Sequence, residues 1–229
     1  MDSRREDTGS LFLAVLLRYL IVIVALGTLL FGAAGTFDYW NGWLYLATIF
    51  VTMGAGFAVL YVKDKSLLGK RIKTREKESR QKAFVAVSSL LILLVYGIPG
   101  LDYRMAWSKV PVYLVIFGEL LLIGGYTLNM GVMLVNSYAS RTVEIQEGQR
   151  VIEDGPYSVV RHPMYAAMIP IYLGTCLILG SFVAIVPCLL LVAALGFRAV
   201  QEEKTLVAGL EGYDAYRQKI KYRMIPFIW

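Results

Sequence analysis

The presence of several separate apolar stretches of about 20 residues is the feature of this sequence that most restricts its fold. A helix of roughly that length crosses a bilayer core about 30 Å thick, and there it must pair its own backbone polar groups. Of 229 residues, 57% are hydrophobic and only 17% are charged, which leaves almost no chain for a separate water-soluble domain. The sequence therefore predicts an all-α, polytopic transmembrane helical bundle.

The apolar runs predict about six spans, and the first run is too long for a signal peptide. Gly180 and Ser181 permit a tight turn, so the last two spans are expected to form a helical hairpin over 164–200. We divide the chain into an N-terminal region, 1–110, with three spans, and a C-terminal region, 111–229. The spans are expected near residues 11–34, 41–62, 83–100, 111–135, 164–180 and 182–200.

Positive charge is concentrated in the link 63–82, between the second and third spans. Lys and Arg are enriched in cytoplasmic loops, so this link is expected to be cytoplasmic, and with an even number of spans both termini are too. The net charge of +6 at pH 7 then reflects topology and attraction to anionic lipids, and nucleic acid is not expected as a partner. The cations of the link are Lys63, Lys65, Lys70, Arg71, Lys73, Arg75, Lys77, Arg80 and Lys82.

The residues that commonly bind metals are few and scattered. Cys176 and Cys188 lie in apolar segments, where a thiol is expected to be a small buried hydrophobe. The chain has one histidine, His162, which excludes a multi-histidine metal site, and no cysteine or carboxylate cluster replaces one. We therefore expect no metal centre.

A polar segment, 136–163, interrupts the apolar pattern between the fourth and fifth spans. It suits either a ligand site or an ordinary connector, with a turn expected at Asp154, Gly155 and Pro156. His162 comes directly before Pro163, which favours the first turn of a helix. Free backbone donors at that helix start can receive an anionic group such as an amino-acid carboxylate, although a histidine at the membrane interface is the simpler interpretation.

Arg198 and Glu202 are four residues apart near the end of the last span, so they share one helix face, with Glu203 beside them. The hairpin should return them to the membrane face where the segment 161–165 lies. Two polar clusters would then meet at one depth, although a surface ion pair would explain the spacing equally well.

Glu119 lies within the fourth span, and Tyr126, Asn129, Met133 and Ser137 follow it at helical spacing. Ionisable residues inside spans tend to face the bundle interior or a cavity. A structural hydrogen bond is as good an explanation as a functional role, and Glu119 is expected in the non-cytoplasmic half.

Four motifs within residues 130–229 resemble the C-terminal core of the isoprenylcysteine carboxyl methyltransferase family, and they read EDGPYSVVRHPMY, EEKTL, GYDAY and RMIPFIW. Phospholipid methyltransferases share much of this pattern. The resemblance implies S-adenosylmethionine as cofactor, bound in a cytoplasmic pocket formed by the loop and hairpin, and a lipophilic acceptor that enters from the bilayer. The implied cofactor contacts are Gln149, Arg150, Val151, Ile152, Tyr157, His162, Pro163, Met164 and Tyr165.

The resemblance assigns Arg198 and Glu202 to the acceptor side, and Glu203 is a further catalytic candidate. A carboxylate acceptor could be held by Arg198, with Glu202 orienting the guanidinium. For a phospholipid amine, Glu202 or Glu203 could act as general base. Gln149 departs from the family, which often has histidine there, and the N-terminal spans match no motif.

The implied activity is methyl transfer to a prenylcysteine-like carboxylate, and the alternative enzyme is a phospholipid amine N-methyltransferase. A transporter or lipid-binding protein, with Glu119 and Arg198 along a solute path, would be expected to show broken or repeated helices, which are not found. A membrane reductase would lack support, because no glycine-rich dinucleotide motif follows a strand.

Overall fold

The computed structural model describes residues 2–63, 79–138 and 148–229, and within these ranges it contains helices and loops but no strand. The prediction of an all-α chain is therefore confirmed for the described residues. The helices are α1 (Asp2–Ala34), α2 (Trp40–Lys63), α4 (Ser79–Met105), α5 (Val112–Val135), the 3₁₀ turn η1 (Gly155–Ser158), α6 (Pro163–Ile178), α7 (Ile185–Gly209) and α8 (Tyr213–Lys219).

Five of these helices are long and apolar enough to cross a membrane, namely Phe12–Ala34, Trp40–Lys63, Phe84–Met105, Val112–Val135 and Ile185–Gly209. The chain is thus an integral membrane protein. The remaining predicted span forms α6, which has only 16 residues. At 1.5 Å per residue it is about 24 Å long, shorter than a typical bilayer core. Most of the basic link lies outside the described residues.

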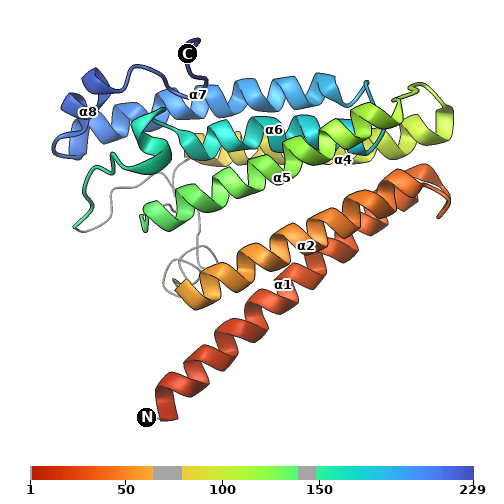
Figure 1. Cartoon of the computed structure of the whole chain (residues 1–229), viewed down its shortest axis with the longest axis horizontal. Coiled ribbons are helices and arrows are strands. Elements are labelled where there is room, and N and C mark those ends of the chain that lie inside the picture. The colour runs from red at the N-terminus through yellow and green to blue at the C-terminus, as the bar shows by residue number, and fades with distance from the viewer. Residues whose placement is uncertain (1, 64–78, 139–147) are drawn as a thin grey trace.

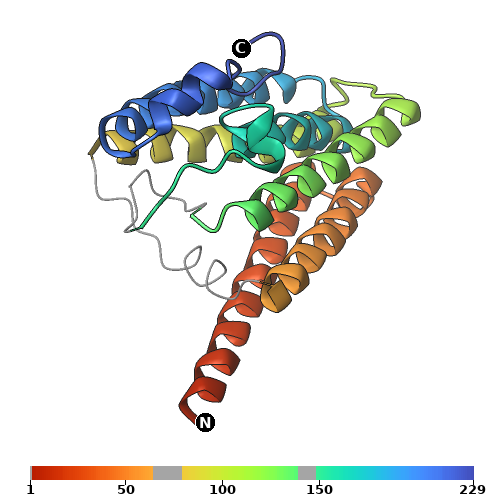
Figure 2. The same cartoon turned by 60° about the vertical axis from the view of Figure 1, so that its left-hand side comes forward.

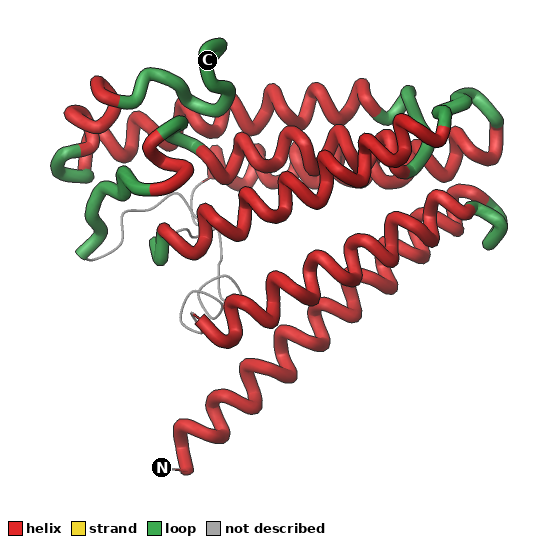
Figure 3. Tube along the Cα trace, in the orientation of Figure 1, coloured by secondary structure: helices red, strands yellow, loops and turns green. Residues whose placement is uncertain are grey.

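The bundle has two different ends. Figure 1 shows that α1 and α2 form an antiparallel pair, which meets the group of α4, α5, α6 and α7 at one end and diverges from it toward the other. The same divergence is visible in Figure 2, and Figure 3 shows that loops lie at both ends. The links 35–39, 106–111 and 179–184 lie at the end where the helices meet, which we call the packed end.

The packed end is joined by hydrogen bonds to the last turn of α6. The Tyr39 hydroxyl donates to the Leu179 carbonyl, and Asn41 Nδ2 donates to the Ile178 carbonyl at 2.6 Å. These carbonyls have no acceptor role within the helix, so outside donors satisfy them. A buried cluster containing Leu30, Tyr45, Leu122, Ile178 and Leu179 packs around this contact.

Asp102 ties the two other links of the packed end together. Its carboxylate accepts from the Ser108 backbone N–H at 2.6 Å, the Ser108 hydroxyl at 2.7 Å and the Ser181 hydroxyl. The expected turn of the hairpin is present, with Gly180 at a φ of +74° that favours glycine. The hairpin turn is therefore held by a buried carboxylate as well as by its own backbone.

Glycines let α5 and α6 approach closely. A Cβ on Gly174 would lie 2.5 Å from the Gly118 carbonyl oxygen, and one on Gly125 would lie 2.6 Å from Ile171 Cγ1. Small residues at such positions are typical of helix contacts in membranes, where van der Waals packing drives association. This contact places the start of α6 beside the end of α5, where the candidate site lies.

Candidate functional site

A cavity opens at the end of the bundle opposite the packed end, between the last turns of α5 and α7, the segment before η1, the start of α6 and α8. We call this the cavity end. Nine of its lining residues are those expected to contact a cofactor: Gln149, Arg150, Val151, Ile152, Tyr157, His162, Pro163, Met164 and Tyr165. The fold thus gathers residues that are spread over 17 positions of sequence into one wall.

Several lining residues were not expected from the sequence. They come from the residues after α5, from the end of α7 and the residue after it, and from α8: Asn136, Tyr138, Thr205, Leu206, Leu210, Tyr213 and Tyr216. The motif GYDAY contains Tyr213 and Tyr216, and it was the available signal for α8. The others could be recognised only once the helices were placed.

Tyr157 joins three elements at the cavity wall. Its hydroxyl accepts from Asn136 Nδ2 at 2.7 Å, and its carbonyl accepts from the Tyr216 hydroxyl at 2.8 Å. Burial, and next the neighbouring Tyr157, raise the pKa of Tyr216 above its ordinary value, so this hydroxyl stays a donor at a pH where a free tyrosine ionises. The expected turn is present, since Gly155 has a φ of +58°.

The start of α6 is where the sequence predicted it. His162 is the residue before the helix and Pro163 is its first residue. The His162 and Tyr165 rings are stacked, with centroids 5.7 Å apart and planes 9° apart. The first turn of a helix has backbone N–H groups without intrahelical acceptors, so the cavity wall presents donors as well as rings.

Glu202 and Arg198 meet at the hydroxyl of Tyr165. This hydroxyl donates to Glu202 Oε2 at 2.8 Å, and Arg198 interacts with the same group by hydrogen bonding and charge. The Arg198 guanidinium also lies 4.7 Å from the ring centre of Phe84, on α4. Glu202 lines the cavity, whereas Arg198 is not among its lining residues. The hairpin brings both residues beside Tyr165.

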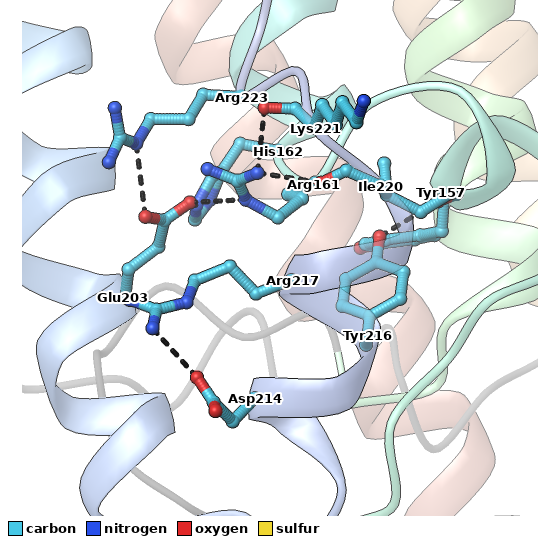
Figure 4. A network of polar contacts seen from close by, with 10 residues as sticks. All are labelled: Tyr157, Arg161, His162, Glu203, Asp214, Tyr216, Arg217, Ile220, Lys221 and Arg223. Atoms are coloured by element: carbon cyan, nitrogen blue, oxygen red, sulfur yellow. Dashed lines mark hydrogen bonds and ion pairs between the residues drawn. The ribbon is translucent and has the colours of Figure 1, made fainter.

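Glu203 points elsewhere, although it adjoins Glu202 in sequence. It is only 4% exposed and is not among the residues lining the cavity. Its Oε1 lies 2.6 Å from Arg161 Nε, and its Oε2 lies 3.0 Å from Arg223 Nε (Figure 4). Successive residues of a helix are about 100° apart, so neighbouring carboxylates face different surroundings.

Arg161 links this buried carboxylate to the C-terminal segment 220–223. Its Nη1 donates to the carbonyls of Ile220 at 2.6 Å and Lys221 at 2.8 Å. The backbone N–H groups of Arg161 and His162 donate to the carbonyls of Tyr222 and Arg223. The turn before α6 is therefore bonded along its length to a segment that follows the last helix.

Three other residues considered in the sequence are not among those lining the cavity. Glu119 is half-buried and accepts from the Thr48 hydroxyl at 3.1 Å, which joins α5 to α2 and favours the structural interpretation. Cys176 and Cys188 are free and buried, as expected of small hydrophobes.

Comparison with protein families agrees with two of the four motifs, EDGPYSVVRHPMY and EEKTL. The model of the isoprenylcysteine carboxyl methyltransferase (ICMT) family matches residues 113–208. Over this segment the chain is ICMT-like. The ICMT-like segment runs from α5 to the end of α7, and it contains every residue expected at the cofactor or acceptor. The chain has no match among curated proteins.

Proposed function

We propose that this protein transfers a methyl group from S-adenosylmethionine to a lipophilic acceptor, by default the carboxylate of a prenylcysteine-like substrate. The observation that carries the proposal is the cavity: all nine expected cofactor residues line it together with Glu202, inside the ICMT-like segment. The fold alone would not carry it, because a helical bundle serves many functions.

The residues of the cavity suit the parts of this cofactor. The first turn of α6 offers free backbone N–H donors and the positive end of a helix dipole to the amino-acid carboxylate. Apolar walls such as Ile152 and Leu206 suit an adenine ring, and Gln149 and Asn136 offer hydrogen bonds. When bound, S-adenosylmethionine would supply an electrophilic methyl group on a sulfonium.

On the acceptor side, Arg198 would hold a carboxylate through a charge-assisted hydrogen bond, while Glu202 and Tyr165 orient the guanidinium. Transfer to a carboxylate requires no proton movement, so the chain would contribute alignment and exclusion of water. The contact of Arg198 with Phe84 supports a role for the N-terminal region, 1–110, in shaping the acceptor end. The division of the chain at residue 110 stays a prediction.

A phospholipid amine is the second candidate acceptor, and the position of Glu202 favours keeping it. An amine must lose a proton to react, and Glu202 is a carboxylate at the cavity wall. Glu203 is ion-paired with Arg161 and Arg223, so for an amine acceptor we propose Glu202 alone as the general base.

The cavity is proposed to face the cytoplasm. It lies at the same end of the bundle as the end of α2 and the start of α4, the two helices that the basic link joins in sequence and whose link is expected to be cytoplasmic (Figure 1). Single cysteines introduced as S79C and W229C, in a C176A/C188A background, should be labelled from the cytoplasmic side. Labelling of S79C from the opposite side would reverse this orientation.

The deciding experiment supplies purified protein with labelled S-adenosylmethionine and a panel of prenylcysteines, phosphatidylethanolamine and mixed lipids. Transfer to a prenylcysteine is expected, and transfer to phosphatidylethanolamine would establish the second candidate. Folded protein that binds neither S-adenosylmethionine nor its demethylated product in calorimetry would refute the proposal and favour a transporter or lipid-binding protein.

A further inference from the structure

Glu203 is the junction of three chain segments at the cavity end. The carboxylate on α7 contacts Arg161 from the turn before α6 and Arg223 from the C-terminal segment (Figure 4). A buried charge is costly unless it is paired and hydrogen-bonded, and here both carboxylate oxygens are used. This arrangement restrains the turn that carries His162 from both sides.

His162 is restrained at its ring as well as at its backbone. Its Nε2 lies 3.3 Å from Glu203 Oε1 and, within the described residues, makes no hydrogen bond. At that distance the carboxylate oxygen is a direct neighbour of the ring nitrogen, although the contact does not have the geometry of a hydrogen bond. The ring also stacks on Tyr165, and this contact keeps it in the cavity wall.

The carboxylate constrains which imidazole nitrogen carries the proton. An ionised carboxylate only accepts hydrogen bonds, so a buried Nε2 beside it is complementary when Nε2 carries a proton. In the neutral ring, a proton on Nε2 leaves the lone pair on Nδ1. The ring would then offer an acceptor to a ligand in the cavity.

We infer that Glu203 is a positioning residue that holds His162 in the Nε2-protonated tautomer, with Nδ1 as the acceptor for a donor group of the bound ligand. The ligand group is an ammonium, hydroxyl or amino group. The identity of that ligand as S-adenosylmethionine rests on the proposed function, whereas the tautomer does not. Glu203 thereby acts through His162 and not on the reacting atoms.

The test uses the fact that this chain has a single histidine. Protein labelled with ¹⁵N-histidine gives one imidazole, whose two nitrogen shifts report the tautomer directly. At about pH 8 the wild-type protein should show a protonated Nε2 and an unprotonated Nδ1. If Nδ1 carries a proton in the wild-type protein, in either the neutral or the charged ring, the inference is wrong and no variant needs to be measured.

Glu203→Gln then tests the cause, because the amide keeps the size of the side chain but removes the charge. The two tautomers should become mixed, and S-adenosylmethionine affinity should fall about ten-fold or more, as expected when a charged hydrogen-bond partner is lost. Glu203→Asp keeps the charge and should restore much of the Nε2-protonated population. Unchanged nitrogen shifts in folded Glu203→Gln would contradict the inference.

Glu153→Gln is the matched control. Glu153 is also ion-paired, to Lys219 at 2.7 Å, but it is exposed, and its change removes the same charge. In this variant, the ¹⁵N shifts of His162 and the affinity for S-adenosylmethionine should match those of the wild-type protein. If wild-type protein fails to bind S-adenosylmethionine but shows the expected tautomer, the proposed function fails and the inference about Glu203 stands.

Discussion

Each end of the bundle contains a buried carboxylate, and the two are surrounded differently. Asp102, at the packed end, is 1% exposed and accepts hydrogen bonds from two serine hydroxyls and a backbone N–H. Glu203, at the cavity end, is 4% exposed and contacts two arginines and the histidine. The neutral donors around Asp102 join two links between helices, whereas the ionic partners of Glu203 place charged groups beside the cavity. Burial of a carboxylate alone therefore does not mark a functional site.

The largest expected effect lies at the cavity end, on residues that line or adjoin the proposed acceptor position. Arg198→Ala and Glu202→Ala should each reduce methyl transfer by about 100-fold or more, since each removes an interaction at the reacting groups. Cofactor affinity should stay within a few-fold of wild type in calorimetry.

The two defects should not add in the double variant, because removing either residue disables the shared arrangement at Tyr165. With an amine acceptor, Glu202→Gln should lose rate most at low pH, where the amine is protonated; with a carboxylate acceptor this dependence should be absent. Near-normal turnover in both alanine variants would reduce the pair to a structural contact.

The next effect separates the two carboxylates by stability. Glu203→Ala leaves two arginines without their shared partner, and breaking a buried ion pair typically costs about 3–5 kcal/mol. Thermal unfolding in detergent should detect this loss, together with weaker cofactor binding. A melting temperature equal to that of the wild type would mean that the ionic cluster contributes little.

Asp102→Ala should be milder and should leave the cavity intact. It leaves hydroxyl and backbone donors unpaired, at a cost of about 1–3 kcal/mol. S-adenosylmethionine affinity should remain within a few-fold of wild type, because Asp102 lies at the packed end. A loss of affinity as large as that of Glu203→Ala would remove the distinction between the two ends.

A smaller effect is expected at the cavity wall from Tyr216→Phe, which removes the hydrogen bond to the Tyr157 carbonyl at a cost of about 1 kcal/mol. Because burial raises the pKa of Tyr216, the unfolded chain releases this proton first as pH rises past about 10. Wild-type stability should fall there, and the fall should be shallower in the variant. Equal slopes in pH-dependent unfolding would assign the alkaline loss to other groups.

The smallest effect is expected from Lys219→Ala, at the surface near the same end. Lys219 and Glu153 are 67% and 43% exposed, and exposed ion pairs contribute little. Neither unfolding nor cofactor binding should change measurably. A clear loss of cofactor affinity would show that the surface charge near the cavity matters more than the buried cluster suggests.

The sequence by itself determined the helices and much of the candidate site. Apolar length predicts a membrane helix because the bilayer core has a fixed thickness, and Pro163 and Gly180 mark a helix start and a turn through their backbone preferences. The nine cofactor candidates could be named because the motifs resemble a known family: five of them lie within EDGPYSVVRHPMY and four directly before it. Their common position in one cavity is consistent with those motifs.

Only the tertiary structure decided which neighbouring side chains face the cavity. Glu202 and Glu203 are adjacent in sequence and alike in chemistry, yet one lines the cavity and the other is bound by Arg161 and Arg223. Arg223 and Tyr216 reach the site from segments beyond α7, so no local pattern could pair them with their partners. The rotation of a helix about its axis is fixed by packing against its neighbours, and that packing is a property of the whole bundle.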